Sequence, residues 1–248
     1  MCTVAVMRVD GGVIIAGNRD ESLTREPARP PREFVIEGVR VVAPIDGRAG
    51  GTWTLVTERG LAMSLLNNYQ APQVPTDSDS ISRGLLVRSL AAASTIDDVL
   101  ARIRTGSVPL ERVRPFMLIV ASAAGKAWIV RWDRSYLTCS DLHLPAIIVS
   151  NGGDIELARR HRTETFSIHR ASWGEQEPTN SQLERFFASH RPERGHFSVC
   201  MHFEPWARTR SYTAIRLLPG CAEIEHLTGS PCQPEERVQL SLLWGEQA

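Results

Sequence analysis

Alternating apolar and polar residues dominate the first quarter of the chain and predict a series of β-hairpins. Residues 2–9 form a short β-rich run, the tight turn Asp10-Gly11-Gly12 follows, and residues 13–17 return. A polar, proline-containing loop is expected over residues 18–32. Further extended runs are expected at residues 34–44, with a break at Glu37-Gly38, and at residues 52–57 and 61–66.

Helical periodicity starts after this block. Asp79 or Ser80 can cap a helix that runs through residue 93, with Leu85, Leu86 and Leu90 on its apolar stripe. Thr95 opens a sequence that resembles a capping box, for a second helix reaching residue 104. Further helices are expected at residues 155–170 and 181–190, and further strands at residues 116–121, 127–132, 146–150, 197–202, 211–217, 222–226 and 238–243.

The order of these elements predicts the fold class. Three strand blocks alternate with two helix pairs, and the chain shows no internal repeat and no low-complexity linker. Such runs favour two stacked antiparallel sheets covered by helices over a doubly wound parallel sheet. We therefore expect a single α+β domain over residues 1–248.

Composition and charge exclude several classes of function. The chain is 42% hydrophobic and 23% charged, which is typical of a globular protein. Its 28 basic and 28 acidic residues balance, so nothing indicates binding to nucleic acid or to an anionic membrane. The basic run Arg159-Arg160-His161-Arg162 is short and Glu164 follows it, which favours a solvated helix face.

The chain also lacks the signals of a membrane or disulfide-bonded protein. No apolar stretch approaches the roughly 18–20 residues that span a bilayer, and the N-terminus lacks the apolar core of a signal peptide. We therefore expect a cytoplasmic protein without integral membrane contact. The five cysteines are odd in number, scattered and without a CxxC pair, which indicates reduced thiols.

Cys200 and His202 have the spacing of a metal-binding pair. No second pair of such residues stands near them in the sequence. We therefore expect a strand that carries both side chains on one face, and no metal site.

Cys2 is the residue with the most distinctive chemistry. Methionine aminopeptidase removes Met1 when the next side chain is small, and the product then carries a thiol and a free α-amine on one residue. That amine has an ordinary pKa of about 8, so near neutrality it can accept the proton of the thiol. A thiolate with its own base is a competent nucleophile.

A polar tetrapeptide is expected beside Cys2. If the chain turns at residues 10–12, the returning strand brings Asn18, Arg19, Asp20 and Glu21 opposite the start of the hairpin. Arg19 could then stabilise the thiolate, and Asp20 or Glu21 could bind the α-ammonium group. A salt-bridged loop start is the alternative.

Further short motifs follow in order along the chain. The motif residues are Met1-Cys2, Asn18-Arg19-Asp20-Glu21, Arg25, Pro27, Gly50-Gly51-Thr52-Trp53, Asn68-Tyr69, Ser150-Asn151 and Thr209-Arg210-Ser211. Together they resemble the NRDE family, which includes the transport and Golgi organisation protein 2 group. The resemblance covers residues 1 to about 217, nearly the whole chain, and is specific only in combination.

That family is in turn similar to the cysteine N-terminal-nucleophile amidases, the group of penicillin V acylases and bile salt hydrolases. The resemblance implies a four-layer αββα sandwich and cleavage of linear amide bonds through an acyl-thioester. It implies that Cys2 is nucleophile and base, that Asn68 and Asn151 supply oxyanion donors, and that Arg210 lies near Cys2. The expected substrate-binding residues are Asn18, Glu21, Trp53 and Tyr69.

The match to the amidases is out of register at one point. They carry Arg-Asn-x-Asp around the first hairpin, whereas here Asn18 stands at the arginine position and Glu21 at the aspartate position. Neighbouring residues on a strand face opposite ways. The sequence therefore leaves open which of Asn18 and Arg19, and which of Asp20 and Glu21, face Cys2. It equally leaves open whether Asn68 or its neighbour Asn67 is the donor.

Two functions follow from these observations. The first is a cysteine amidohydrolase or acyltransferase, without cofactor, acting on a small acylated substrate. The alternative is a non-catalytic protein that handles lipid or haem, for which Cys200-Met201-His202 offers three types of iron ligand. No G-x-S-x-G elbow or P-loop is present, and both a monomer and a homo-oligomer remain open.

Overall fold

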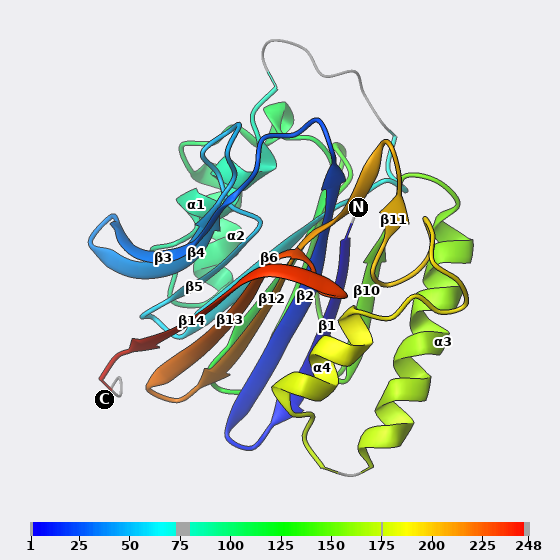
Figure 1. Ribbon diagram of the computed structural model, residues 1–248. Helices are drawn as coiled ribbons and strands as arrows, with labels where there is room; N and C mark the ends of the chain where they lie inside the picture. The colour runs from blue at the N-terminus through cyan, green and yellow to red at the C-terminus, as the bar shows by residue number, and fades with distance from the viewer. Residues whose placement is uncertain (1, 73–79, 175, 246–248) are drawn as a thin grey trace.

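A computed structural model describes residues 2–72, 80–174 and 176–245. Two antiparallel sheets pack face to face, with one pair of helices outside each sheet (Figure 1). The helices are α1 (Arg83–Ser89), α2 (Ile96–Thr105), the 3-10 turn η1 (Leu110–Arg112), α3 (Ile155–Trp173) and α4 (Asn180–Phe187). Among the described residues, no helix combines the length and the apolar character needed to cross a membrane.

Each sheet has seven strands within the described residues. Sheet A contains, in spatial order, β10 (Ala146–Ser150), β1 (Cys2–Val9), β2 (Gly12–Ser22), β12 (Ala207–Leu218), β13 (Cys221–Ser230) and β14 (Gln233–Leu243), with β11 (His202–Phe203) paired to β12. Sheet B contains β3 (Arg29–Ile36), β4 (Val39–Ile45), β5 (Thr54–Thr57), β6 (Leu61–Asn67), β7 (Phe116–Ser122), β8 (Ala127–Trp132) and β9 (Leu137–Asp141).

Three apolar clusters fill the spaces between the four layers. Val4 and Ile15 of sheet A meet Ile119 of sheet B in the middle cluster. Ala5, one residue after Val4, belongs to the cluster under α3 and α4, because successive side chains of a strand point to opposite faces. A third cluster joins α1 and α2 to sheet B. The expected α+β class and αββα layering are therefore confirmed.

Two local predictions in the first half are wrong. The expected loop over 18–32 is largely strand, because β2 continues to Ser22 and pairs along its length with β12. The first helix is shorter than expected and begins after Ser82, whose hydroxyl accepts a hydrogen bond from the Gly84 backbone N–H. Of its expected apolar stripe, Leu86 and Leu90 are buried, whereas Leu85 is exposed. Asp79, the other proposed cap, lies outside the described residues.

The expected strand over 197–202 is also wrong. Residues 195–200 form turns, and strand pairing begins only at His202, which lies opposite Arg208. Backbone bonds tie this segment to its surroundings instead: the N–H of Cys200 donates to the carbonyl of Ser189, and that of His202 donates to the carbonyl of Gly195. Apolar content alone therefore did not distinguish a buried irregular segment from a strand.

Candidate active site

A cleft of about 520 Å³ opens between the two sheets at the edge where β1 begins and where β2 and β6 end. Cys2, Arg19, Trp53, Asn67 and Arg83 lie on its lining. These residues come from both sheets and from the start of α1. The strand that begins with Cys2 is thus positioned beside a large group of polar side chains.

The register of the first hairpin decides which side chains face Cys2. Cys2 lies opposite Arg19 in β2 and opposite Ser150 in β10. Residues directly opposite in antiparallel strands share a face, so the side chains of Cys2 and Arg19 both point toward sheet B. The prediction that the hairpin returns the tetrapeptide beside Cys2 is confirmed. Because facing alternates, Asn18 and Asp20 point toward the helix layer.

Asn18 is therefore held away from the cleft by the helix layer. It is buried, and its Nδ2 donates to the carbonyl oxygens of Phe187 and Val199 at 2.9 and 3.0 Å. These bonds fasten β2 to the end of α4 and to the segment after it. The side chain is committed to this contact, which differs from the expected substrate-binding position.

Asp20 is buried in a charged network behind Cys2. Its Oδ2 lies 3.2 Å from Arg162 Nη1, and its Oδ1 accepts a hydrogen bond of 2.7 Å from the Thr209 hydroxyl. Burial raises the pKa of the Asp20 carboxyl, against the opposing effects of Arg162 and Thr209. The carboxylate is thus held by Arg162 and Thr209 on the helix side of sheet A, while Asp20 also contributes to the lining of the cleft.

The prediction that the basic run 159–162 forms a solvated helix face is wrong for Arg162. Its side chain is fully buried, because α3 turns this position toward sheet A together with Ala158 and Phe166. Besides Asp20, the guanidinium donates to the Thr3 hydroxyl at 2.7 Å and to the carbonyls of His196 and Phe197 at 3.3 Å each. The i, i+4 spacing from Ala158 was the sequence signal that could have revealed it.

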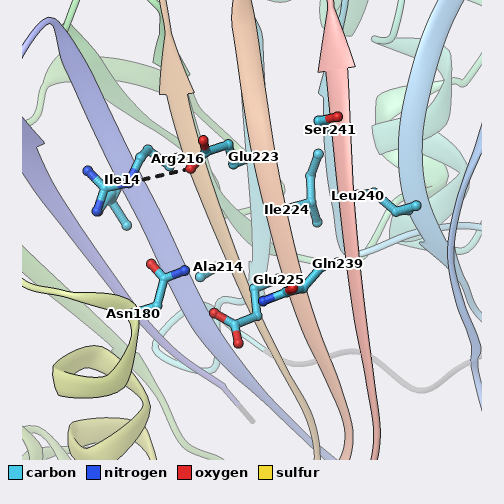
Figure 2. A pocket seen from close by; sticks show the side chains of 10 residues that line it. All are labelled: Ile14, Asn180, Ala214, Arg216, Glu223, Ile224, Glu225, Gln239, Leu240 and Ser241. Atoms are coloured by element: carbon cyan, nitrogen blue, oxygen red, sulfur yellow. Dashed lines mark ion pairs between the residues drawn. The ribbon is translucent and has the colours of Figure 1, made fainter.

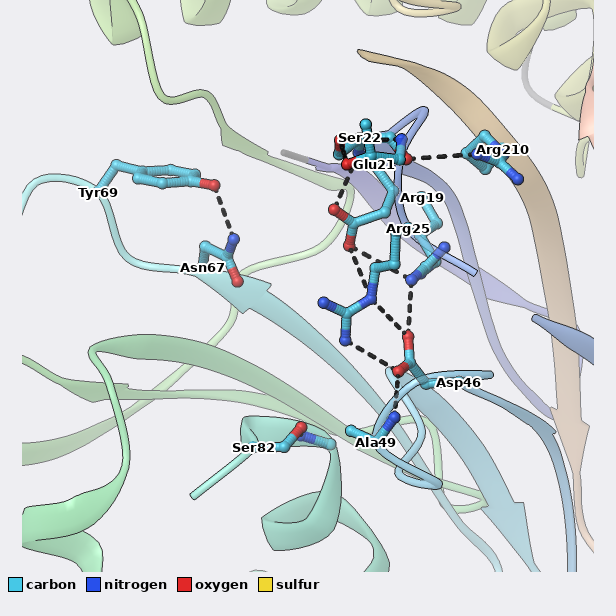
Figure 3. A network of polar contacts seen from close by, with 12 residues as sticks. Arg19, Glu21, Ser22, Arg25, Asp46, Ala49, Asn67, Tyr69, Ser82 and Arg210 are labelled. Atoms are coloured by element: carbon cyan, nitrogen blue, oxygen red, sulfur yellow. Dashed lines mark hydrogen bonds and ion pairs between the residues drawn. The ribbon is translucent and has the colours of Figure 1, made fainter. Parts of the chain in front are cut away.

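Arg19 is held in the cleft by a network of ion pairs (Figure 3). Its Nη2 lies 2.8 Å from Asp46 and 3.3 Å from Glu21, and Asp46 also binds Arg25 at 2.8 Å. The guanidinium packs over the ring of Trp53, 4.5 Å from its centroid. Trp53 and Glu21 thus reach the cleft as expected, and both fix the position of Arg19.

Asp46 was not singled out in the sequence. It follows β4 and also accepts a hydrogen bond from the Ala49 backbone N–H at 2.9 Å. Burial opposes its ionisation, but the hydrogen bonds and charges of Arg25 and its neighbours lower the pKa of Asp46 below the ordinary value. An acidic residue directly after a buried strand, followed by the glycines of the Gly50-Gly51 turn, was the available signal.

The electrostatic surroundings of Cys2 are mixed. Burial raises the pKa of the Cys2 thiol, and Asp20 adds to this effect. A hydrogen bond from the Asp20 backbone and the positive charge of Arg19 act in the opposite direction. The thiolate form of Cys2 is thus favoured by the Arg19 guanidinium and the Asp20 backbone N–H, which both lie in the same hairpin.

The two neighbouring asparagines at the end of β6 face different ways. Asn67 lies on the cleft, where its Nδ2 donates to the Tyr69 hydroxyl at 2.8 Å. Asn68 is one residue further and turns away, with its Nδ2 3.4 Å from the carbonyl of Trp132. Tyr69 reaches the cleft as expected, whereas Asn67 takes the place expected for Asn68.

Asn151 and Arg210 lie close to the cleft without lining it. Asn151 is buried; its Oδ1 accepts from the Gly153 N–H at 2.8 Å and its Nδ2 lies 3.5 Å from the His196 carbonyl. Arg210 stands at a bulge in β12 and donates to the Ser22 carbonyl at 3.3 Å. Arg210 lines a separate small pocket, to which Arg19 also contributes.

Positive charge is in excess on the cleft. Among the described residues of its lining, the arginines are Arg19, Arg25, Arg48, Arg83 and Arg114, and the carboxylates are Asp20, Glu21 and Asp46. Arg83 was not expected here; it begins α1 and donates to the Pro115 carbonyl at 3.1 Å. Burial lowers its pKa to about 10, so it stays cationic at neutral pH.

A second hollow, of about 380 Å³, lies on the outer face of sheet A next to the start of α4 (Figure 2). Its charged side chains include Glu225 and an Arg216–Glu223 pair at 4.0 Å. Among the described residues that line it, none is a cysteine or a histidine. Nucleophilic chemistry therefore points to the Cys2 cleft.

This sandwich, with a cysteine at the start of a central strand, has the fold of the N-terminal-nucleophile hydrolases. It is similar to the conjugated bile acid hydrolase of Clostridium perfringens (TM-score 0.63, 12% identity, 98% of this chain and 92% of that chain covered). It is also similar to the penicillin V acylase of Agrobacterium tumefaciens (TM-score 0.54, 13% identity, 98% of this chain and 86% of that chain covered). A third similar structure is the Caenorhabditis elegans orthologue of N-acylethanolamine-hydrolyzing acid amidase (TM-score 0.58, 13% identity, 87% of this chain and 92% of that chain covered). Such low identities show the fold alone.

The chain belongs to the Transport and Golgi organisation 2 family, whose sequence model matches residues 1–196. No curated protein matches the chain. The family assignment agrees with the NRDE resemblance, and the fold agrees with the further similarity to cysteine amidases.

Proposed function

We propose that this protein is a cysteine N-terminal-nucleophile amidohydrolase or acyltransferase that acts on a small acylated substrate. The observation that carries the proposal is the position of Cys2, at a strand start, facing a polar cleft of about 520 Å³ with Arg19 directly opposite. The relatives named above act on conjugated bile acids, penicillin V and N-acylethanolamines according to their names, which makes an acyl-amide the first substrate class to test.

The proposed reaction begins with removal of Met1, which frees the α-amine of Cys2. That amine takes the thiol proton, and the thiolate attacks the acyl carbon. The C–N bond breaks, the leaving amine takes the proton back, and an acyl-thioester remains on Cys2. Water, or an acceptor amine or alcohol, then attacks the thioester and releases the acyl group.

Asn67 is the donor we propose for the oxyanion of this reaction. Its side-chain amide belongs to the cleft and its orientation is fixed by the Tyr69 hydroxyl. Its backbone carbonyl accepts a hydrogen bond of 2.7 Å from Ser150, the β10 partner of Cys2. This contact couples the end of β6 to the strand that carries the nucleophile. A donor held in this way needs little reorganisation as charge develops.

We infer that the preferred substrate carries a negative charge. The described lining has more arginines than carboxylates, and Arg83 keeps its charge despite burial. Arg19 and Arg25 share Asp46 and Glu21, whereas Arg83 binds a neutral carbonyl, so its charge is less compensated. An acyl chain or leaving amine with a carboxylate complements this cleft.

The experiment is turnover of a panel of N-acyl amides, with and without a carboxylate, followed by release of the free amine. We expect hydrolysis by the wild type and by Cys221→Ser, which changes a cysteine of comparable exposure on β13. We expect none by Cys2→Ala. Full activity of Cys2→Ala on a substrate of the wild type would sink the proposal, and binding without turnover of any member would favour a non-catalytic protein.

A further inference from the structure

Four side chains of the types that bind metal ions lie close together near β11 and the turn between β13 and β14. His190 follows α4, Cys200 and His202 flank Met201 at the start of β11, and Cys232 lies in the turn between β13 and β14. Their ligand atoms all lie within 4.8 Å of one another. Three separate chain segments thus meet at one point, outside the lining of the Cys2 cleft.

The distances around His202 match a tetrahedral metal site. Its Nε2 lies 3.6 Å from Cys200 Sγ and 3.4 Å from Cys232 Sγ. Zinc bonds of about 2.3 Å to sulfur and 2.0–2.1 Å to nitrogen, at tetrahedral angles, separate two such ligands by about 3.6 Å. Without a metal ion, one sulfur can bond to Nε2 while the Cys200 and Cys232 thiols bond to each other. A shared metal ion accounts for the approach of all three atoms at once.

His190 is the fourth side chain of this group. Its ring lies 5.0 Å from that of His202 and is inclined to it by 65°. Its Nε2 is buried and has no hydrogen-bond partner among the described residues, which is costly for a polar atom. A metal ion bound to this nitrogen removes that cost.

Two side chains contact the Nδ1 atom of His202, and only one of these contacts is compatible with a metal ion on Nε2. Its Nδ1 lies 3.4 Å from Glu204 Oε1, the acceptor that orients many metal-bound histidines. The Arg194 guanidinium lies 3.1 Å from the same nitrogen. A metal ion on Nε2 leaves the proton on Nδ1, so Glu204 becomes its partner and Arg194 must turn aside.

We propose that His190, Cys200, His202 and Cys232 bind one zinc-class divalent ion. Two thiolates and two imidazoles favour a soft or borderline ion in tetrahedral geometry. Four protein ligands leave no open position, so the ion is structural. The sequence suggested no metal site because the other two residues do not form a closely spaced pair: His190 lies ten residues before Cys200, and Cys232 lies thirty residues after His202.

The position of this site indicates what it stabilises. The Met201 backbone N–H, between two of the ligands, donates to the Thr209 hydroxyl at 2.8 Å. That hydroxyl donates in turn to Asp20 at 2.7 Å. Since the Asp20 backbone contacts the Cys2 thiol, the metal-bound segment supports the wall behind the nucleophile.

Metal binding is tested on the purified, reduced full-length protein with Zn²⁺ and Co²⁺ alone, independently of any activity. We expect one ion per chain and a Co²⁺ spectrum with tetrahedral ligand-field bands and a sulfur-to-metal charge-transfer band. We also expect Zn²⁺ to raise the melting temperature. Cys232→Ser, a change in a surface turn, should weaken Co²⁺ binding at least about 10-fold and abolish the rise in melting temperature.

Cys139→Ser is the matched control, because Cys139 is also exposed but lies on β9 of the other sheet. It should bind Co²⁺ like the wild type. The proposal is overturned by a Co²⁺ spectrum without a sulfur band, by equal affinity of Cys232→Ser and Cys139→Ser, or by a Cys200–Cys232 disulfide that forms in the presence of excess Zn²⁺.

Discussion

The buried pair of Arg162 and Asp20 gives the strongest prediction about stability. Arg162→Met keeps most of the side-chain volume but removes the guanidinium, which leaves Asp20 and the Thr3 hydroxyl without this donor in a buried site. Removing one partner of a buried ion pair costs about 3–5 kcal/mol. With a urea dependence of roughly 3 kcal/mol per M, the unfolding midpoint should fall by roughly 1–1.7 M.

The assay is urea unfolding followed by tryptophan fluorescence, with Arg159→Met as the control on the same helix. The Arg159 side chain is 42% exposed and pairs with Glu156 at the surface, so its loss should cost at most about 0.5 kcal/mol.

A double-mutant cycle with Asp20→Asn isolates the interaction between the two buried groups. The cycle should give a coupling energy of about 1–3 kcal/mol. Additive costs, or an Arg162→Met variant as stable as Arg159→Met, would refute the reasoning.

Three further predictions concern the cleft and its surroundings. Asn67→Ala should lower kcat about 10²–10³-fold while Asn68→Ala stays near the wild type, measured on the same substrate; the reverse order would return the donor role to Asn68. Arg83→Gln should raise KM for a carboxylate-bearing substrate at least about 10-fold and leave its neutral analogue unchanged; equal effects on both would contradict an anionic substrate. Burial lowers the pKa of His226 to about 4, so the free energy of unfolding should fall by about 3 kcal/mol as pH drops from about 6.5 to 4. Chemical unfolding of His226→Gln at several pH values should show a correspondingly weaker dependence of stability on pH. The same dependence in the variant and the wild type would contradict this prediction.

The layering and the first hairpin could be predicted from the sequence because both depend on local rules. A glycine turn with Gly11 at φ 72° fixes where the chain reverses, and the period of two then fixes which residues oppose Cys2. The family resemblance located the same segments. The sequence did not predict which of two neighbouring residues faces the cleft. A shift of the strand register by one residue would put Asp20 in the place of Arg19, or Asn68 in the place of Asn67.

Contacts between distant segments escaped the sequence analysis. Arg162 was interpreted as solvated because a basic run is usually exposed, and its burial depends on acceptors in β1, β2 and the segment after α4. The cluster around His202 likewise needs the β13–β14 turn to bring Cys232 close. Arg83 reaches the cleft only because α1 begins at the edge of sheet B. Spacing along α3 could indicate that Arg162 faces inward, but it identifies neither the acceptors of Arg162 nor the partners of His202 and Arg83.

The most direct test of the account is the intact mass of the purified protein before and after incubation with acyl-amides and acyl-thioesters, followed by peptide mapping. We predict a chain that has lost Met1 and that gains an acyl group on Cys2, and no such adduct on Cys2→Ala. A chain that retains Met1, or one that reacts on another cysteine as readily as on Cys2, would contradict the proposed nucleophile.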